Sequence, residues 1–106
     1  MQSTEKYKVT VNEKAGNMLD EHADFLAQVS IDAADRLLSR FEKIIARLAD
    51  NPFQFPYADE LDIPGLLPNT YRKCLFEERY KVLFLTGEGE VFVDAVIDSR
   101  RENKNL

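Results

Sequence analysis

The strongest periodic pattern in the chain lies between residues 34 and 48, where apolar residues recur every three or four positions. This spacing places them on one broad face of a helix, as in helices that pack against a core. The apolar face comprises Ala34, Leu37, Leu38, Phe41, Ile44, Ile45 and Leu48. The solvated side comprises Arg36, Arg40, Lys43 and Arg47. The predicted helix stops at Asn51, because Pro52 cannot continue it.

A shorter amphipathic pattern directly precedes this helix. Its apolar positions are Ala15, Leu19, His22 or Ala23, Leu26 and Val29. Asn12 is a favourable N-cap for this first helix, and Ser30 is a plausible cap for the second. Because the break between the two patterns is so short, the helices are predicted to lie antiparallel, as a helical hairpin.

Four segments have the alternation or the β-branched composition of strands. They are Tyr7–Val11, Tyr71–Phe76, Arg79–Thr86 and Glu90–Asp98. The connections between the last three are too short for anything except antiparallel pairing. The sequence therefore predicts a single α+β domain over residues 1–106, in the order β-α-α-β-β-β. Its antiparallel sheet of about four strands packs against an N-terminal helical hairpin. The periodicity does not decide whether the first strand lies at the edge or inside the sheet.

The segment Asn51–Thr70 contains all four prolines and has no clear periodicity. A connection of about twenty residues is uncommon in a compact domain and is usually functional or ordered by short turns. Its apolar residues predict that it lies on the core. They are Phe53, Phe55, Leu61, Ile63, Leu66 and Leu67.

The formal net charge is −5, which disfavours a general nucleic-acid binder because phosphate attraction needs a basic face. The charge is unevenly distributed. Residues 1–70 carry seven Lys or Arg against twelve Asp or Glu, whereas residues 71–106 carry seven of each. The excess acid therefore belongs to the first two-thirds of the chain, and the last third is neutral and locally rich in arginine.

Cys74 is the only cysteine, so neither an internal disulfide nor a structural zinc site is expected. We expect no metal and no cofactor. The polar start of the chain has no apolar segment typical of a signal peptide. No apolar run approaches the roughly 20 residues of a membrane span. The expected location is the cytoplasm, without membrane association.

The most suggestive candidate chemistry is cationic. Arg72 and Lys73 open the second predicted strand, Arg79 opens the third, and Arg100 and Arg101 follow the fourth. In an antiparallel meander Arg79 and Arg100 are expected to approach each other, and Arg72 joins them only if the strands are staggered. Clustered guanidinium groups can clamp a phosphate or stabilise a transition state. The alternative is ion pairing with nearby acids, namely Asp94, Asp98, Glu77 and Glu78.

Two other groups are weaker candidates for acid–base chemistry. His22 is the only histidine, and it is expected at the boundary between the first helix and the sheet rather than in a catalytic set. Asp94 and Asp98 lie four residues apart on one predicted strand, so they are expected on the same face of the sheet.

The last third of the chain reads YRKCLFEERYKVLFLTGEGEVFVDAVIDSRREN. It resembles the C-terminal half of RelE/ParE-family toxins, which show an Arg on the second strand, here Arg72. An Arg-Tyr pair, here Arg79-Tyr80, then opens an apolar strand ending in Phe84. A Gly-containing turn and a Val-rich strand closed by Asp98-Ser99-Arg100 follow. Upstream, YKVTVNEKA and IIARLADNP agree with the same pattern. The resemblance covers about residues 6–103.

This resemblance implies a RelE-like fold and the toxin role in a bacterial type II toxin–antitoxin system, of the kind also called plasmid stabilisation systems. A cognate antitoxin wraps and neutralises such toxins. One branch of the superfamily cleaves mRNA in the ribosomal A site, and another poisons DNA gyrase. We expect the antitoxin to cover hydrophobic surface or a sheet edge and to carry a basic amphipathic segment.

Members of the cleaving branch are ribosome-dependent endoribonucleases. For this branch, the resemblance implies that the scissile phosphate is bound by Arg72, Arg79 and Arg100. Lys73 or Tyr80 would assist. Members of that branch often carry a Tyr or His near the C-terminus, but none follows Phe92 here. The alternative is therefore a toxin that inhibits gyrase, or one that binds only its antitoxin. An unrelated interaction domain is the third hypothesis.

Overall fold

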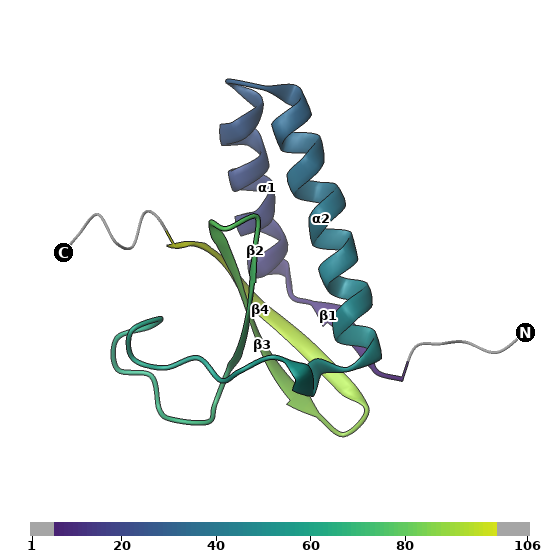
Figure 1. Ribbon diagram of the computed structural model, residues 1–106, viewed down its shortest axis with the longest axis vertical. Helices are drawn as coiled ribbons and strands as arrows, with labels where there is room; N and C mark the ends of the chain where they lie inside the picture. The colour runs from purple at the N-terminus through teal and green to yellow at the C-terminus, as the bar shows by residue number, and fades with distance from the viewer. Residues whose placement is uncertain (1–5, 100–106) are drawn as a thin grey trace, which may run out of the picture.

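The computed structural model describes residues 6–99. The elements are β1 (Lys8–Val11), α1 (Glu13–Ala27), α2 (Ile31–Asp50), a 3-10 turn η1 (Pro52–Gln54), β2 (Arg72–Phe76), β3 (Tyr80–Gly87) and β4 (Glu90–Asp98). The two helices lie side by side and antiparallel, and together they pack against the sheet (Figure 1). The predicted order of elements is confirmed.

Both predicted helix caps are present. The side-chain oxygen of Asn12 accepts a hydrogen bond from the Ala15 amide at 2.7 Å. The Ser30 hydroxyl oxygen accepts one from the Ala33 amide at 3.1 Å. These bonds satisfy amides that have no partner within the helix, so each helix begins where its cap stands. Neither helix within residues 6–99 is long and apolar enough to span a lipid bilayer.

The sheet has the order β1-β4-β3-β2. The meander β2-β3-β4 is antiparallel, as expected, but β1 pairs with β4 in parallel, with Val9 opposite Val91. The prediction of a wholly antiparallel sheet is therefore wrong for this one pair, and the sheet is mixed. No tight turn joins β1 to its neighbour; the helical hairpin separates them along the chain, so the direction of β1 is not restricted by a short connection.

One face of the sheet packs against both helices and forms the core. The strands contribute side chains with no exposed surface, which are Val82, Phe84, Val91, Val93 and Val96. From α2 the most deeply buried are Leu37 and Leu48. The apolar stripe predicted for the second helix is thus the face that meets the sheet.

The proline-rich connection lies only partly on the core. Phe55 and Ala58 are buried, but Leu61 and Leu67 are 94% and 73% exposed. Figure 1 shows the connection leaving η1 and looping out beside the sheet before it returns to β2. The prediction that the connection lies on the core is therefore right at Phe55 and wrong for these two leucines.

The turn between β2 and β3 has a strained backbone. Glu77 and Glu78 both have positive φ, 53° and 54°, in the left-handed region that Gly adopts without strain. We expect Glu78→Gly to raise the free energy of unfolding by about 1 kcal/mol, because it removes this strain. Urea unfolding measures the gain. Glu88→Gly is the matched control, since Glu88 lies in the other hairpin turn without positive φ; an equal gain there would refute the strain argument.

Candidate functional site

Arg79 directly precedes β3, where the β2–β3 turn meets the last residues of β4. Its Nε and Nη2 atoms donate to Oδ2 of Asp98 at 3.1 and 2.9 Å. The guanidinium also lies over the Tyr80 ring, 5.2 Å from its centroid. The hydrogen bond to Asp98 raises the pKa of Arg79, although partial burial opposes it. Asp98 is only 4% exposed, so this is a buried carboxylate neutralised by an arginine.

Two cavities flank Arg79 and Tyr80 on the helix side of the sheet. One, of about 280 Å³, is lined by polar side chains that include His22, Glu21 and Asp98, and we call it the His22 cavity. The other, of about 460 Å³, lies between the helices and the β2–β3 turn. A cation, a phenol, an imidazole and a carboxylate therefore meet at one end of the molecule.

His22 is held in place by the sheet. Its Nε2 atom lies 2.8 Å from the carbonyl oxygen of Val96, and its ring centroid lies 5.1 Å from that of Tyr80. The expected position at the helix–sheet boundary is confirmed. Its place beside Arg79 was not foreseen, and the one available signal was a polar residue at an apolar position of the first helix.

Arg72 and Lys73 lie at the opposite end of β2 from Arg79. In the β2–β3 ladder Arg72 is opposite Phe84, whereas Phe76 is opposite Tyr80. At about 3.3 Å per residue, the four steps of β2 separate the two ends by roughly 13 Å. The structure therefore does not bring Arg72 and Arg79 together. The strands lack the stagger that would have been needed for these two arginines to meet. Arg100 and Arg101 lie outside the described residues.

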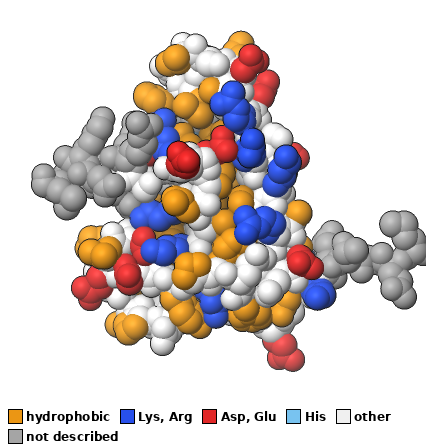
Figure 2. Space-filling model, viewed as in Figure 1, with side chains coloured by type: hydrophobic (Ala, Val, Ile, Leu, Met, Phe, Trp, Pro, Cys, Tyr) orange, Lys and Arg blue, Asp and Glu red, His pale blue; other side chains and the backbone are white. Residues whose placement is uncertain are grey.

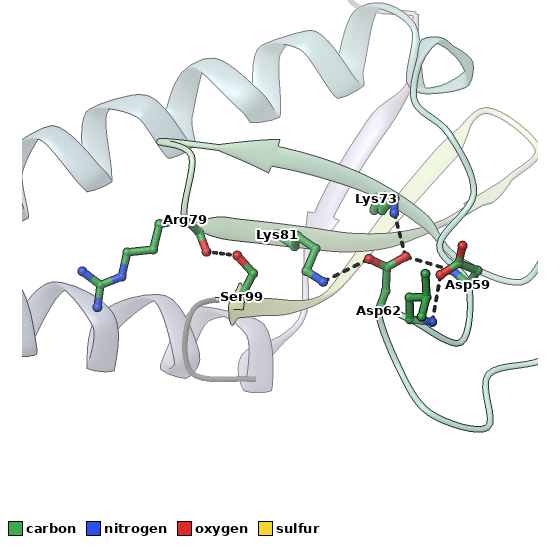
Figure 3. Close-up of polar contacts among 7 residues, drawn as sticks. Asp59, Asp62, Lys73, Arg79, Lys81 and Ser99 are labelled. Carbon is green, nitrogen blue, oxygen red and sulfur yellow. Dashed lines mark hydrogen bonds and ion pairs between the residues drawn. The ribbon is translucent and has the colours of Figure 1, made fainter. Parts of the chain in front are cut away.

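Lys73 faces the side of the sheet opposite the helices and contacts Asp62 of the proline-rich connection. The Nζ atoms of Lys73 and Lys81 lie 2.8 and 3.0 Å from the two Asp62 carboxylate oxygens, and the Asp59 amide donates to Asp62 at 2.9 Å. Figure 3 shows both lysines reaching Asp62 from neighbouring strands, while the side chain of Arg79 extends away from them. The sequence reasoning missed this cluster.

Asp62 is only 6% exposed. Burial by itself raises the pKa of Asp62, but the hydrogen bonds from Lys73, the Asp59 amide and Lys81 outweigh it. They hold the pKa well below its usual range. The signal in the sequence was Lys81, a charged residue inside an otherwise apolar strand, because such a residue needs a buried counter-charge. The cluster fastens the connection to the sheet.

Asp94 and Asp98 do not share a site. A β-bulge shifts the β3–β4 register between Leu83 and Phe84, and Asp94 is the extra residue on β4. Asp94 accepts hydrogen bonds from the Tyr71 hydroxyl at 2.7 Å and from the side-chain amide of Asn12 at 3.0 Å. It borders a cavity of about 410 Å³ that Asp62 also lines, whereas Asp98 borders the His22 cavity. The prediction of a common face is wrong because the bulge breaks the alternation.

Residues 9–103 match the family model for the ParE toxin of the type II toxin–antitoxin system, parDE. Among solved structures, the fold resembles a chain from the chromosomal ParDE toxin–antitoxin system of P. aeruginosa. The sequence identity is 15% and the TM-score 0.68, and the alignment covers 91% of this chain and 98% of that one. Among curated proteins, no match was found. The family resemblance and the α+β fold predicted from the sequence are thereby confirmed.

Proposed function

Because the chain belongs to the ParE toxin family of type II toxin–antitoxin systems, we propose that it inhibits growth by binding DNA gyrase. The family implies an antitoxin partner, and we propose that a cognate antitoxin neutralises the toxin. The observation that carries this choice over mRNA cleavage is the separation of the basic side chains. Arg79 is paired with Asp98, Lys73 is paired with Asp62, and Arg72 lies at the other end of β2.

The cleavage mechanism predicted from the sequence needs several cations on one scissile phosphate, since the developing charge must be stabilised at one point. The described residues provide no such convergence of Arg72, Lys73 and Arg79. Inhibition by binding requires no convergence, because separate contacts can contribute to one interface. The missing Tyr or His after Phe92 supports the same choice.

A second candidate function is ribosome-dependent mRNA cleavage at the His22 cavity. The observation that favours it is the meeting of His22, Tyr80, Arg79 and Asp98 around a space of about 280 Å³. An imidazole and a phenol can exchange protons, and an arginine can stabilise a phosphate. In this version Arg79 and Tyr80 keep the roles predicted for them, and Arg72 and Lys73 do not.

Two assays on the purified toxin decide between these functions. We expect micromolar toxin to inhibit supercoiling by gyrase and to leave mRNA intact in a translation extract. If the wild type cleaves mRNA and the double variant His22→Ala, Arg79→Gln leaves it intact, the second candidate function is supported instead. Unimpaired supercoiling at that concentration would remove the gyrase proposal.

In cells, expression of the toxin alone is expected to arrest growth, and co-expression of the antitoxin encoded beside it is expected to restore growth. Colony counts after induction measure both results. Normal growth on expression of the toxin alone, with soluble protein present, would contradict the toxin assignment for this chain.

A further inference from the structure

An arginine is packed against two partly exposed aromatic rings where the proline-rich connection meets β2. The guanidinium carbon of Arg72 lies 4.1 Å from the ring centroid of Tyr57 and 5.1 Å from that of Phe53. Its Nη1 atom donates to the carbonyl oxygen of Phe55 at 2.7 Å. Phe53 and Tyr57 are 50% and 44% exposed. We call these three side chains, Phe53, Tyr57 and Arg72, the aromatic–arginine patch.

The charge of this patch is not neutralised within residues 6–99. Lys73, Lys81 and Arg79 each contact a carboxylate, but Arg72 forms no ion pair there. Its Nε atom is buried and has no hydrogen-bond partner. Nearby, Arg47 lies over the Phe55 ring at 4.8 Å and donates to the Gln54 side chain, again without an ion pair. Two arginines that contact the same residue, Phe55, without an ion pair are notable in a chain with net charge −5.

The backbone holds the patch in a defined geometry. Tyr57 forms a β-bridge with Arg72, and the Lys73 amide donates to the Pro56 carbonyl oxygen at 2.9 Å. The Asn51 side chain accepts from the Phe53 amide at 3.1 Å, and the Phe53 ring packs edge-on against Tyr7. A partner would therefore meet side chains that lose little conformational freedom on binding.

The composition of the patch fits a protein partner with acidic side chains. Arg and aromatic residues are enriched among the contacts that dominate protein interfaces. A guanidinium binds a carboxylate through strong charge-assisted hydrogen bonds. Figure 2 shows Lys and Arg side chains beside hydrophobic ones over the face of the molecule that carries η1 in Figure 1. A nucleic-acid strand fits less well, because tracking phosphates needs more cations than these two arginines and the whole chain is acidic.

The position of the patch distinguishes its partner from the antitoxin. A basic antitoxin segment, as we expect from the acidic first two-thirds of the chain, is repelled by Arg47 and Arg72. Acidic side chains instead line the cavities at the opposite end, namely Glu21, Asp24, Glu77 and Glu78. We propose that the aromatic–arginine patch binds an acidic segment of the toxin's target protein; this inference rests on the proposed function, in which that target is gyrase.

The test compares Arg72→Gln and Phe53→Ala with the wild type in binding to the gyrase holoenzyme and in inhibition of supercoiling. Each substitution is expected to weaken both by about tenfold or more, as the loss of a dominant interface contact does. Lys43→Gln removes one exposed positive charge of α2 that is not part of the patch, and it is expected to match the wild type. Urea unfolding of all four proteins identifies any loss that comes from misfolding.

The outcomes separate this inference from the proposed function. If the wild type inhibits gyrase and the Arg72→Gln and Phe53→Ala variants inhibit it equally, the role of the patch is overturned. The proposed gyrase inhibition is then kept. A wild type without effect on gyrase would overturn both. If the wild type binds a single-stranded DNA oligonucleotide and Arg72→Gln loses this binding, the proposal of an acidic protein partner is overturned in favour of nucleic acid. If Phe53→Ala unfolds, the more conservative Arg72→Lys replaces it, with an intermediate loss expected because lysine cannot stack as arginine does.

Discussion

Replacement of Asp62 by alanine is expected to lower the free energy of unfolding by about 3 kcal/mol, because it removes the carboxylate that two lysines on neighbouring strands contact. Breaking a buried ion pair is costly, since the remaining charges stay partly desolvated. Here Asp62 and Lys81 are buried and Lys73 is half-buried. Equilibrium unfolding in urea measures the loss.

Asp59→Ala is the control for this substitution. Asp59 is exposed, and its side chain accepts only a local hydrogen bond, from the Leu61 amide at 2.9 Å. We expect it to cost about 1 kcal/mol or less. Equal losses for the two variants would mean that the ion pairs of Asp62 add no stability beyond that of the local turn at Asp59.

The Asp62 cluster also predicts a dependence of stability on pH. The pKa of Asp62 is lowered in the folded chain, so its stabilisation is fully present above the unfolded value of about 3.9. It is lost as the pH falls below that value towards the folded pKa. The stability difference between the wild type and the Asp62→Ala variant should therefore shrink between about pH 4 and pH 2, as measured by urea unfolding. A difference that stays constant over this range would contradict the lowered pKa.

The second large effect is expected in the core. Phe84 has no exposed surface and packs edge-on against Phe55, with ring centroids 5.9 Å apart. Phe84→Ala removes this packing and leaves a cavity, so we expect a loss of about 4 kcal/mol. Phe92→Ala on the adjacent strand is the matched control, because Phe92 is 37% exposed and its loss should stay near 1 kcal/mol. Similar losses from the two substitutions, measured by urea unfolding, would show that Phe84 does not anchor the core.

Most of the basic side chains among residues 71–99 are used within the fold. Three of the basic side chains in the last third, Lys73, Arg79 and Lys81, are taken up by buried or partly buried ion pairs. These cations stabilise the fold rather than present a basic face. Among residues 71–99, Arg72 is the arginine that forms no ion pair, which is why the proposal for the aromatic–arginine patch depends on it.

The sequence by itself determined the elements and most of their connections. The apolar stripe from Ala34 to Leu48, the caps Asn12 and Ser30, and the two short turns are local signals, because helix periodicity, capping and hairpin geometry involve residues close along the chain. They were sufficient to predict a helical hairpin on a sheet, and the ordered motifs around Arg79-Tyr80 were sufficient for the family.

The tertiary structure alone decided how distant residues meet. The parallel pairing of β1, the bulge at Asp94, the contact of Asp62 with two strands and the place of His22 beside Arg79 all depend on pairings between residues far apart in the chain. A strand's side-chain alternation does not name its neighbour, and one extra residue in a ladder reverses the faces beyond it. For the same reason, a set of arginines at strand ends did not reveal that Arg72 and Arg79 lie at opposite ends of β2.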